Sequence, residues 1–308
     1  MPSAQSLQVT KKGMVIIMSE YLIVSDATLD LPNSLVEQYD IRVIPMLMDI
    51  DGEVYTHYPD ERELSIEDFY TKLKNGAHPH TSQITPLVFM DYFTEILEQG
   101  LDILYIAFSS GLSGTYNTAQ IVINDLREKY PDRRIYAVDS LCASIGEGLI
   151  VHQAALQKEK GASIDELRDW VEDNKSYARH WFTVKDLFYL KRGGRVTSIE
   201  AVVGSALRIR PVLSTDKDGK LTVVSKIRGY KAEMDLLISK LKSEGVDIKN
   251  QTVIIGHSDN LEQARKLETM IRDLDIVKDV VISKIGPVIG THTGPGMLAL
   301  VFMGKEND

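Results

Sequence analysis

The sequence predicts an α/β protein of two domains, a parallel-sheet three-layer domain followed by an α/β domain of α+β character. Short β-branched runs alternate with amphipathic segments as far as about residue 177, which is typical of βαβ units. Beyond residue 178 a strong hairpin signal, Asp-Lys-Asp-Gly at 216–219, interrupts that alternation. The 308 residues suffice for two domains of ordinary size. We therefore expect a leader over residues 1–18 that need not be ordered, a first domain over 19–177 and a second over 178–308.

The elements of the first domain follow from local signals. Ser65 and Ser163 each stand three residues before an acidic residue, which is the spacing of a capping box, and Thr85 precedes a proline at the first helical position. The expected helices cover residues 33–39, 65–74, 86–97, 115–129, 143–159 and 163–177. The expected strands cover residues 21–25, 41–50, 101–108 and 134–138.

The second domain mixes a hairpin with helices, which favours a sheet covered by helices on one side. The expected strands cover residues 181–184, 208–214, 221–228, 252–256, 277–285 and 298–303. The expected helices cover residues 185–194, 198–206, 230–243 and 260–272.

The composition narrows the class of function. A net charge of −9 argues against a general nucleic-acid binder, because phosphate neutralisation needs a basic surface. No apolar run approaches the roughly 18 residues of a membrane span, so no integral membrane segment is expected. The single cysteine, Cys142, excludes an intrachain disulfide and fits a reducing compartment, so we expect a cytoplasmic protein. For Cys142 a small buried role is favoured over a nucleophilic one.

Three clusters of hydroxyl and glycine residues are the strongest functional signal. They are Thr-Ser-Gln at 81–83, Ser-Ser-Gly-Leu-Ser-Gly-Thr-Tyr at 109–116 and Gly-Thr-His-Thr-Gly-Pro-Gly at 290–296. Each is expected at a strand-to-helix junction, where unpaired backbone N–H groups and hydroxyl donors suit a carboxylate or phosphate headgroup. For any one cluster, helix caps and turns are the favoured explanation, whereas three clusters together favour a binding site.

Other chemistries have weaker support. Ser113 with His257 or His292 is the candidate pair for a hydrolase, but residues 111–115 lack the final glycine of a nucleophile elbow. No histidine pair has a metal-ligand spacing and no nucleotide-binding glycine motif is present, so neither a metal nor a cofactor is expected. Asp26 is a candidate acid or base, although an Asx turn is favoured. A regulatory module that binds a small carboxylate is a third alternative.

A basic motif, Tyr-Leu-Lys-Arg-Gly-Gly-Arg, occupies residues 189–195. A helix C-terminus needs only one or two cations against its dipole, so three within five residues favour a patch for a phosphate or an acidic protein partner. Arg208 and Arg210 either extend this patch or line one face of a strand.

In this order the motifs resemble the DegV family of bacterial fatty-acid-binding proteins. The resemblance covers residues 20–303 and rests on Ser-Asp-x-Thr at 25–28 together with the three clusters and the basic motif. In one place the sequence departs from the family pattern, since the proline expected directly after Gln83 stands at position 86. The resemblance implies two α/β domains with one long-chain fatty acid buried between them, and a carrier without enzymatic activity of its own.

The resemblance also implies roles for individual residues. Thr81 and Ser113 would bind the carboxylate through their hydroxyls, with His292 nearby. The wider expected ligand-binding set is Thr81, Ser82, Ser113, Gly114, Thr115, His292, Thr293 and Arg192, and the expected partner-docking set is Lys191, Arg192 and Arg195. Family members of this type hand the acid to a fatty acid kinase subunit, and the acyl phosphate feeds phospholipid synthesis.

Overall fold

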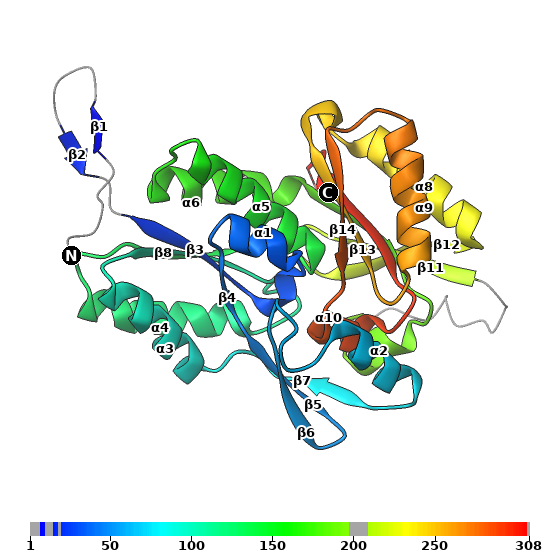
Figure 1. Cartoon of the computed structure of the whole chain (residues 1–308), viewed down its shortest axis with the longest axis horizontal. Helices are drawn as coiled ribbons and strands as arrows, with labels where there is room; N and C mark the ends of the chain where they lie inside the picture. The colour runs from blue at the N-terminus through cyan, green and yellow to red at the C-terminus, as the bar shows by residue number, and fades with distance from the viewer. Residues whose placement is uncertain (1–6, 10–14, 18–19, 197–208, 307–308) are drawn as a thin grey trace.

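The computed structural model describes residues 7–9, 15–17, 20–196 and 209–306 of the chain (Figure 1). Within the leader, β1 (Leu7–Val9) pairs antiparallel with β2 (Val15–Ile17). The helix expected at 198–206 lies outside the described residues. All the other expected helices and strands are present, with ends displaced by a few residues. Within the described residues, no helix combines the length and apolar composition that a membrane crossing needs.

The expected parallel sheet is present and has four strands. Their order is β4 (Arg42–Ile44), β3 (Tyr21–Asp26), β8 (Asp102–Ala107) and β9 (Ile135–Asp139), and every neighbouring pair is parallel. Successive residues of β3 alternate between two hydrophobic clusters, because both faces of the sheet are buried. Figure 1 shows α3 (Pro86–Glu98) and α4 (Thr115–Lys129) on one face, with α5 (Ile145–Glu159) and α6 (Ile164–Asn174) on the other. This domain therefore has three layers.

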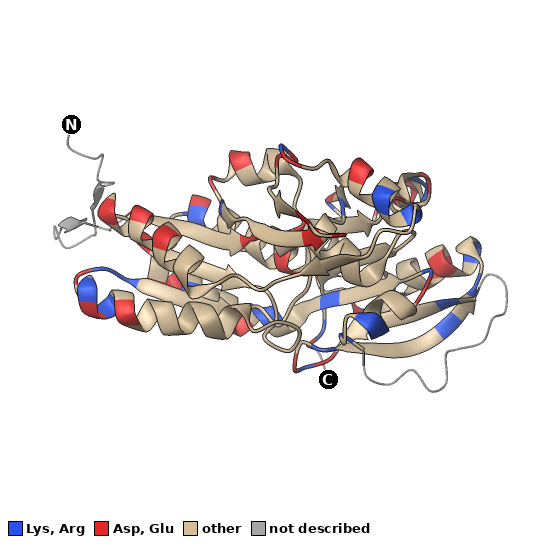
Figure 2. Cartoon of the chain, turned by 90° about the horizontal axis from the view of Figure 1, so that it is seen from below, with Lys and Arg blue, Asp and Glu red and all other residues tan. Residues whose placement is uncertain are grey.

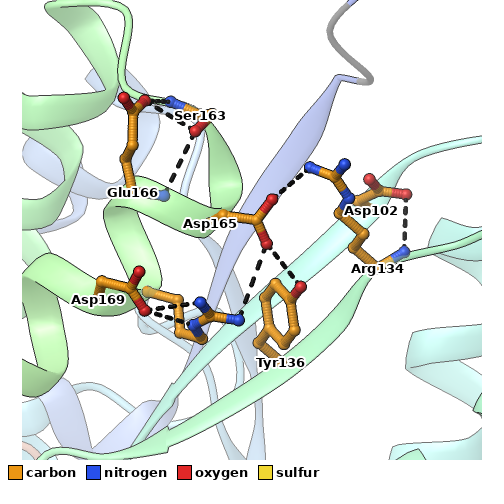
Figure 3. A network of polar contacts seen from close by, with 8 residues as sticks. Asp102, Arg134, Tyr136, Ser163, Asp165, Glu166 and Asp169 are labelled. Carbon is orange, nitrogen blue, oxygen red and sulfur yellow. Dashed lines mark hydrogen bonds and ion pairs between the residues drawn. The ribbon is translucent and has the colours of Figure 1, made fainter.

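Hydrogen bonds link the first turn of α6 to its N-cap residue and to the start of β9 (Figure 3). The expected capping box is confirmed, since the Glu166 N–H donates to Ser163 Oγ at 3.3 Å and the Ser163 N–H donates to the Glu166 carboxylate at 2.9 Å. Asp165 accepts from Arg134 Nη1 and from the Tyr136 hydroxyl, each at 2.6 Å. These bonds fix how α6 lies on the sheet.

A small three-stranded sheet is inserted after β4. Its order is β6 (Glu53–His57), β5 (Met46–Ile50) and β7 (Pro79–Thr81), with α2 (Ile66–Lys74) between β6 and β7 and α1 (Asn33–Gln38) before β4. The single strand expected at 41–50 is divided at Pro45, which has no N–H to donate to a ladder. Neither β6 nor β7 was expected from the sequence, and β7 carries Thr81 to the candidate site.

The second sheet has six strands. Their order is β12 (Leu221–Arg228), β11 (Ile209–Thr215), β10 (Ala178–Thr183), β15 (Leu298–Met303), β13 (Thr252–His257) and β14 (Asp279–Lys284), and only β13 and β14 are parallel. The hairpin expected between β11 and β12 is confirmed. The short helices η2 (Lys175–Tyr177) and η3 (Ile248–Asn250) precede β10 and β13. The division proposed at residue 177 stays a prediction.

Helices cover both faces of this second sheet, whereas the sequence favoured one side. The outer face packs on α8 (Tyr230–Glu244) and α9 (Leu261–Asp273). The inner face packs on α5, which contacts β10, β13 and β15 as well as β3 and β8. A helix enclosed by two sheets is buried nearly all round, and ten residues of α5 are buried. The two sheets are therefore joined through α5.

Two short helices complete the neighbourhood of the site, namely α7 (Phe188–Arg192) and α10 (Pro287–Thr293). The sequence placed the cluster at 290–296 at a strand-to-helix junction, and this is wrong. The cluster instead forms the C-terminal half of α10 and the turn before β15. Gly294, at a φ of 70°, ends the helix in a conformation that favours glycine, and a proline follows it.

Candidate ligand-binding cavity

A cavity of about 190 Å³ lies where the two sheets approach each other. The ends of β3 and β8 contribute Asp26 and Phe108, in keeping with the rule that ligands bind beyond the carboxyl ends of parallel strands. β10 and β15 contribute Phe182 and Ala299 on the opposite side. Further apolar walls come from Met46, Leu112, Ile145, Leu190, Leu221, Val288, Ile289, Met297 and Val301. Most of the wall is thus hydrocarbon.

The three hydroxyl and glycine clusters meet in the wall of this cavity. The lining residues drawn from them are Thr81, Ser82, Gln83, Ser113, Gly114, Thr115, His292 and Thr293. Residues 81 and 292 are far apart in the chain, yet Thr81 Oγ1 and His292 Nε2 form a hydrogen bond of 2.8 Å. Every residue of the expected ligand-binding set except Arg192 therefore lines one cavity, and the role of each stays a prediction.

The first two clusters also contact each other. A Cβ on Gly114 would overlap Oε1 of Gln83, so a residue without a side chain allows this close approach. Ser113 Oγ and Thr115 Oγ1 share a hydrogen bond of 2.9 Å, and the Thr115 N–H donates to Ser113 Oγ at 3.3 Å. The start of α4 thus presents hydroxyl groups and a helix N-terminus to the cavity.

His292 is a neutral group at this polar end. Burial, together with the charges of Arg195 and Arg192, lowers the pKa of His292 to about 4. Its Nε2 is bonded to Thr81, and its Nδ1 is buried without a hydrogen-bond partner among the described residues. One buried polar atom at this end of the cavity therefore lacks a hydrogen-bond partner among the described residues.

The cations of the basic motif take different positions from those expected. Arg195 is half-buried and lines the cavity, and its Nε donates to the carbonyl of Leu112 at 3.2 Å. Arg192 is exposed and does not line this cavity, and its Nη1 lies 3.3 Å from His78 Nδ1. Lys191 is exposed. The guanidinium closest to the headgroup region is thus that of Arg195.

Arg210 does not extend the basic patch. It is buried, and its Nε lies 2.9 Å from Glu233 Oε1, an ion pair formed under α8. A buried arginine needs such a partner. Arg208 lies outside the described residues.

In the described part of the chain, the groups for a hydrolase are not assembled. The Ser113 hydroxyl contacts Thr115, and His292 contacts Thr81. His257 is not in the cavity wall, and its Nδ1 accepts from the Asn260 N–H at 3.3 Å. Burial raises the pKa of the Cys142 thiol, which disfavours the thiolate. No three His, Cys, Asp or Glu side chains of the described residues are grouped to hold a metal ion.

Comparison with known proteins identifies the family. The family described as "Uncharacterised protein, DegV family" matches residues 20–305. The chain belongs to the DegV family. A DegV domain-containing protein of Clostridium perfringens is 44% identical over 291 residues, which cover 94% of this chain and all of that one.

Two solved structures are similar over nearly the whole chain. A DegV lipid-binding protein from Thermotoga maritima is 32% identical, with a TM-score of 0.80, over 94% of this chain and 100% of that one. A DegV family protein from Thermus thermophilus, described as binding fatty acid, is 26% identical, with a TM-score of 0.82, over 93% of this chain and 100% of that one. The expected fold is therefore confirmed.

This DegV chain also buries a carboxyl cluster that sequence analysis missed. Asp26 caps η1 (Ala27–Leu29) by accepting from the Thr28 N–H at 3.1 Å, which is the Asx-type turn that was favoured. Thr28 Oγ1 lies between the two carboxyls, in contact with Asp26 Oδ1 and 2.9 Å from Glu147 Oε2. Burial raises the pKa of Asp26 and raises that of Glu147 well above its ordinary value. Sequence analysis had singled out Asp26 alone, and Glu147 was visible only as an acidic residue in the apolar first half of α5.

The third buried carboxyl, Asp30, ties together two elements that border the cavity. It accepts from Ser144 Oγ before α5 and, at 2.8 Å, from the Gly286 N–H before α10. Burial raises the pKa of Asp30 to about 7. Another polar pair in the wall joins β10 to β11, since His180 Nδ1 lies 3.1 Å from Thr215 Oγ1. No sequence pattern distinguished these residues from ordinary strand and turn positions.

Proposed function

We propose that this DegV protein binds one long-chain fatty acid in the cavity between its sheets and presents it to a fatty acid kinase. The observation that carries the proposal is a single, mostly apolar cavity into which three polar clusters converge. An apolar chain with one anionic head is the ligand class that such a wall complements. The fatty acid binding described for the Thermus relative supports the same ligand class.

The size of the cavity fits this class. Its volume of about 190 Å³ is many times the roughly 10–15 Å³ that a single water needs, so it has room for an extended ligand. Burying an acyl chain of about sixteen carbons contributes on the order of 10 kcal/mol gross, from which the cost of association is subtracted. A short polar acid would leave most of this apolar wall uncovered.

We further propose that Thr81 and Ser113 donate hydrogen bonds to the carboxylate. A buried carboxylate must be well hydrogen-bonded, since otherwise it protonates. Ser82, Gly114, Thr115 and Thr293 border the same region and complete the proposed ligand-binding set with His292. Arg195 supplies the positive charge of the cavity wall, in place of the Arg192 that sequence analysis proposed.

The kinase partner is proposed from the distribution of charge. Residues 178–308 contain 21 Lys and Arg against 16 Asp and Glu, whereas residues 1–177 contain 14 against 28. In the ribbon of Figure 2, residues of both signs occur along the chain, with more Lys and Arg positions at the end away from the N-terminus. Lys191, Arg192 and Arg195 lie in this more basic half, which favours docking to an acidic surface. We propose that the docked kinase makes an acyl phosphate for phospholipid synthesis in the cytoplasm.

Thermal unfolding with added ligand tests the binding proposal. A ligand that binds only the native state raises the free energy of unfolding, and with it the melting temperature. At a free ligand concentration of a hundred times the dissociation constant, the added free energy is about 2.7 kcal/mol. Lipid-free protein should therefore be stabilised by palmitate and left unchanged by hexanoate at equal concentration. Stabilisation by hexanoate alone would favour the small-carboxylate module, and turnover of model esters lost in Ser113→Ala would favour the hydrolase.

A further inference from the structure

A second cavity, of about 170 Å³, adjoins the first at its polar end. Thr81, Arg195 and His292 line both cavities. The second cavity adds Pro79 and His80 from β7, Arg192 and Gly193 from the end of α7, and Thr291 from α10. The two cavities therefore share part of their lining, including Thr81, which is proposed to bind the carboxylate.

His292 lines both cavities, and its two ring nitrogens have different neighbours. Nε2 is bonded to Thr81 at 2.8 Å. A Cβ on Gly193 would overlap Nδ1, so Nδ1 faces Gly193, which lines the second cavity and not the first. This Nδ1 is buried and has no hydrogen-bond partner among the described residues. A polar atom of this kind calls for a ligand or a water.

The second cavity is strongly positive. Arg192 and Arg195 both line it, and no carboxylate among the described residues forms an ion pair with either. Arg195 donates to the carbonyls of Leu112 and Gly193. The side-chain partners of Arg192 within the described residues are the His78 ring and the face of Tyr189. The planar fork of a guanidinium binds phosphate oxygens in pairs.

The second cavity is large enough for a phosphoryl group. Its volume of about 170 Å³ is several times the roughly 10–15 Å³ that a single water needs. The phosphorus of an acyl phosphate is joined to a former carboxylate oxygen, so it must lie directly beside the carboxylate site.

We propose that the second cavity is a phosphoryl subsite, which binds the phosphate group of an acyl phosphate whose chain occupies the first cavity. This inference rests on the proposed fatty acid binding. The protein then holds both the acid and its phosphorylated form without moving the chain. Arg192 contacts the phosphate and not the carboxylate, which accounts for its place outside the first cavity.

The test compares two ligands on three proteins. Palmitate probes the first cavity alone, and the β-keto phosphonate analogue of palmitoyl phosphate, which cannot be hydrolysed, probes both. Arg192→Gln should weaken binding of the phosphonate about ten-fold or more while changing palmitate affinity less than two-fold. Lys217→Gln, which removes an exposed cation from the β11–β12 turn, is the control for general charge and should change neither.

The outcomes separate this inference from the function on which it rests. If the wild-type protein does not bind palmitate, the proposed function is contradicted and the subsite with it. If palmitate binds normally but Arg192→Gln leaves phosphonate affinity unchanged, the subsite alone is overturned. Equal losses in Arg192→Gln and Lys217→Gln would also overturn it, because they would show a charge effect without a site.

Discussion

Replacing Asp30 by Asn tests the buried carboxyl cluster. Asp30 is buried at the end of η1 in the left-handed region, at a φ of 47°, which Asn also tolerates. Its carboxyl accepts from Ser144 Oγ and from the Gly286 N–H. An Asn side chain has the same shape and can keep both contacts, because the Ser144 hydroxyl can accept as well as donate. The substitution therefore removes a titratable proton and little else.

The expected effect has a definite sign. Burial raises the pKa of Asp30 from 3.8 to about 7, so between these values the native protein keeps a proton that the unfolded chain releases. Fewer protons are then bound in the unfolded state, and the free energy of unfolding of the wild type falls as pH rises through this window. A difference of about three pKa units corresponds to about 4 kcal/mol. Asp30→Asn should match the wild type near pH 4 and exceed its stability by up to this amount above pH 7.

Urea unfolding of both proteins at intervals from about pH 4 to 8.5 measures the difference directly. Histidines of lowered pKa, such as His180 and His257, titrate in the same window, but they are present in both proteins and cancel in the comparison. Asp91→Asn, at an exposed position of α3, is the control and should show no pH-dependent difference. A difference between Asp30→Asn and wild type that stays constant with pH would refute this reasoning.

Three further perturbations address the cavity and its surroundings. Thr81→Val and Ser113→Ala each remove a proposed carboxylate donor and should weaken palmitate binding roughly 5- to 150-fold, at about 1–3 kcal/mol for each bond, so wild-type affinity by calorimetry in both would reject the assignment. Gly193→Ala places a Cβ against the imidazole that holds Thr81 and should lower palmitate affinity, whereas Gly194→Ala, with open space but a φ of 71°, should lower only stability. Lys191→Glu should slow acyl-phosphate production with the kinase, most at low salt, while the lipid stays bound; full activity across a salt series would exclude a docking role.

Local sequence patterns predicted most of the helices and strands. The strands around 21–26 and 102–107 are buried on both faces, and their continuous apolar runs make them visible in the sequence. The capping box at 163–166 likewise marked the start of α6. Such patterns depend only on residues that are close in the sequence, so they can be recognised without knowledge of the tertiary structure.

What the sequence could not show depends on long-range contacts. β6 and β7 are short, and their pairing with β5 depends on a fold that no local pattern encodes. α10 begins with a proline, but its glycine and β-branched residues have low helix propensity. The helix is stabilised instead by packing on α2 and α7, which the sequence does not show. The contact of Thr81 with His292 arises because β7 and α10 pack together. The sequence therefore indicated the three polar clusters, whereas only the tertiary structure shows that they lie side by side.

The most direct test of the central claim is mass spectrometry of the purified protein after denaturation in organic solvent. The account predicts one long-chain fatty acid for each chain, because an acid whose chain is buried against a mostly apolar wall should survive purification. The matched sample is Thr81→Val prepared in parallel, which should carry less of the same acid. A wild-type spectrum with no long-chain acid, from protein that also fails to take up added palmitate, would contradict the account.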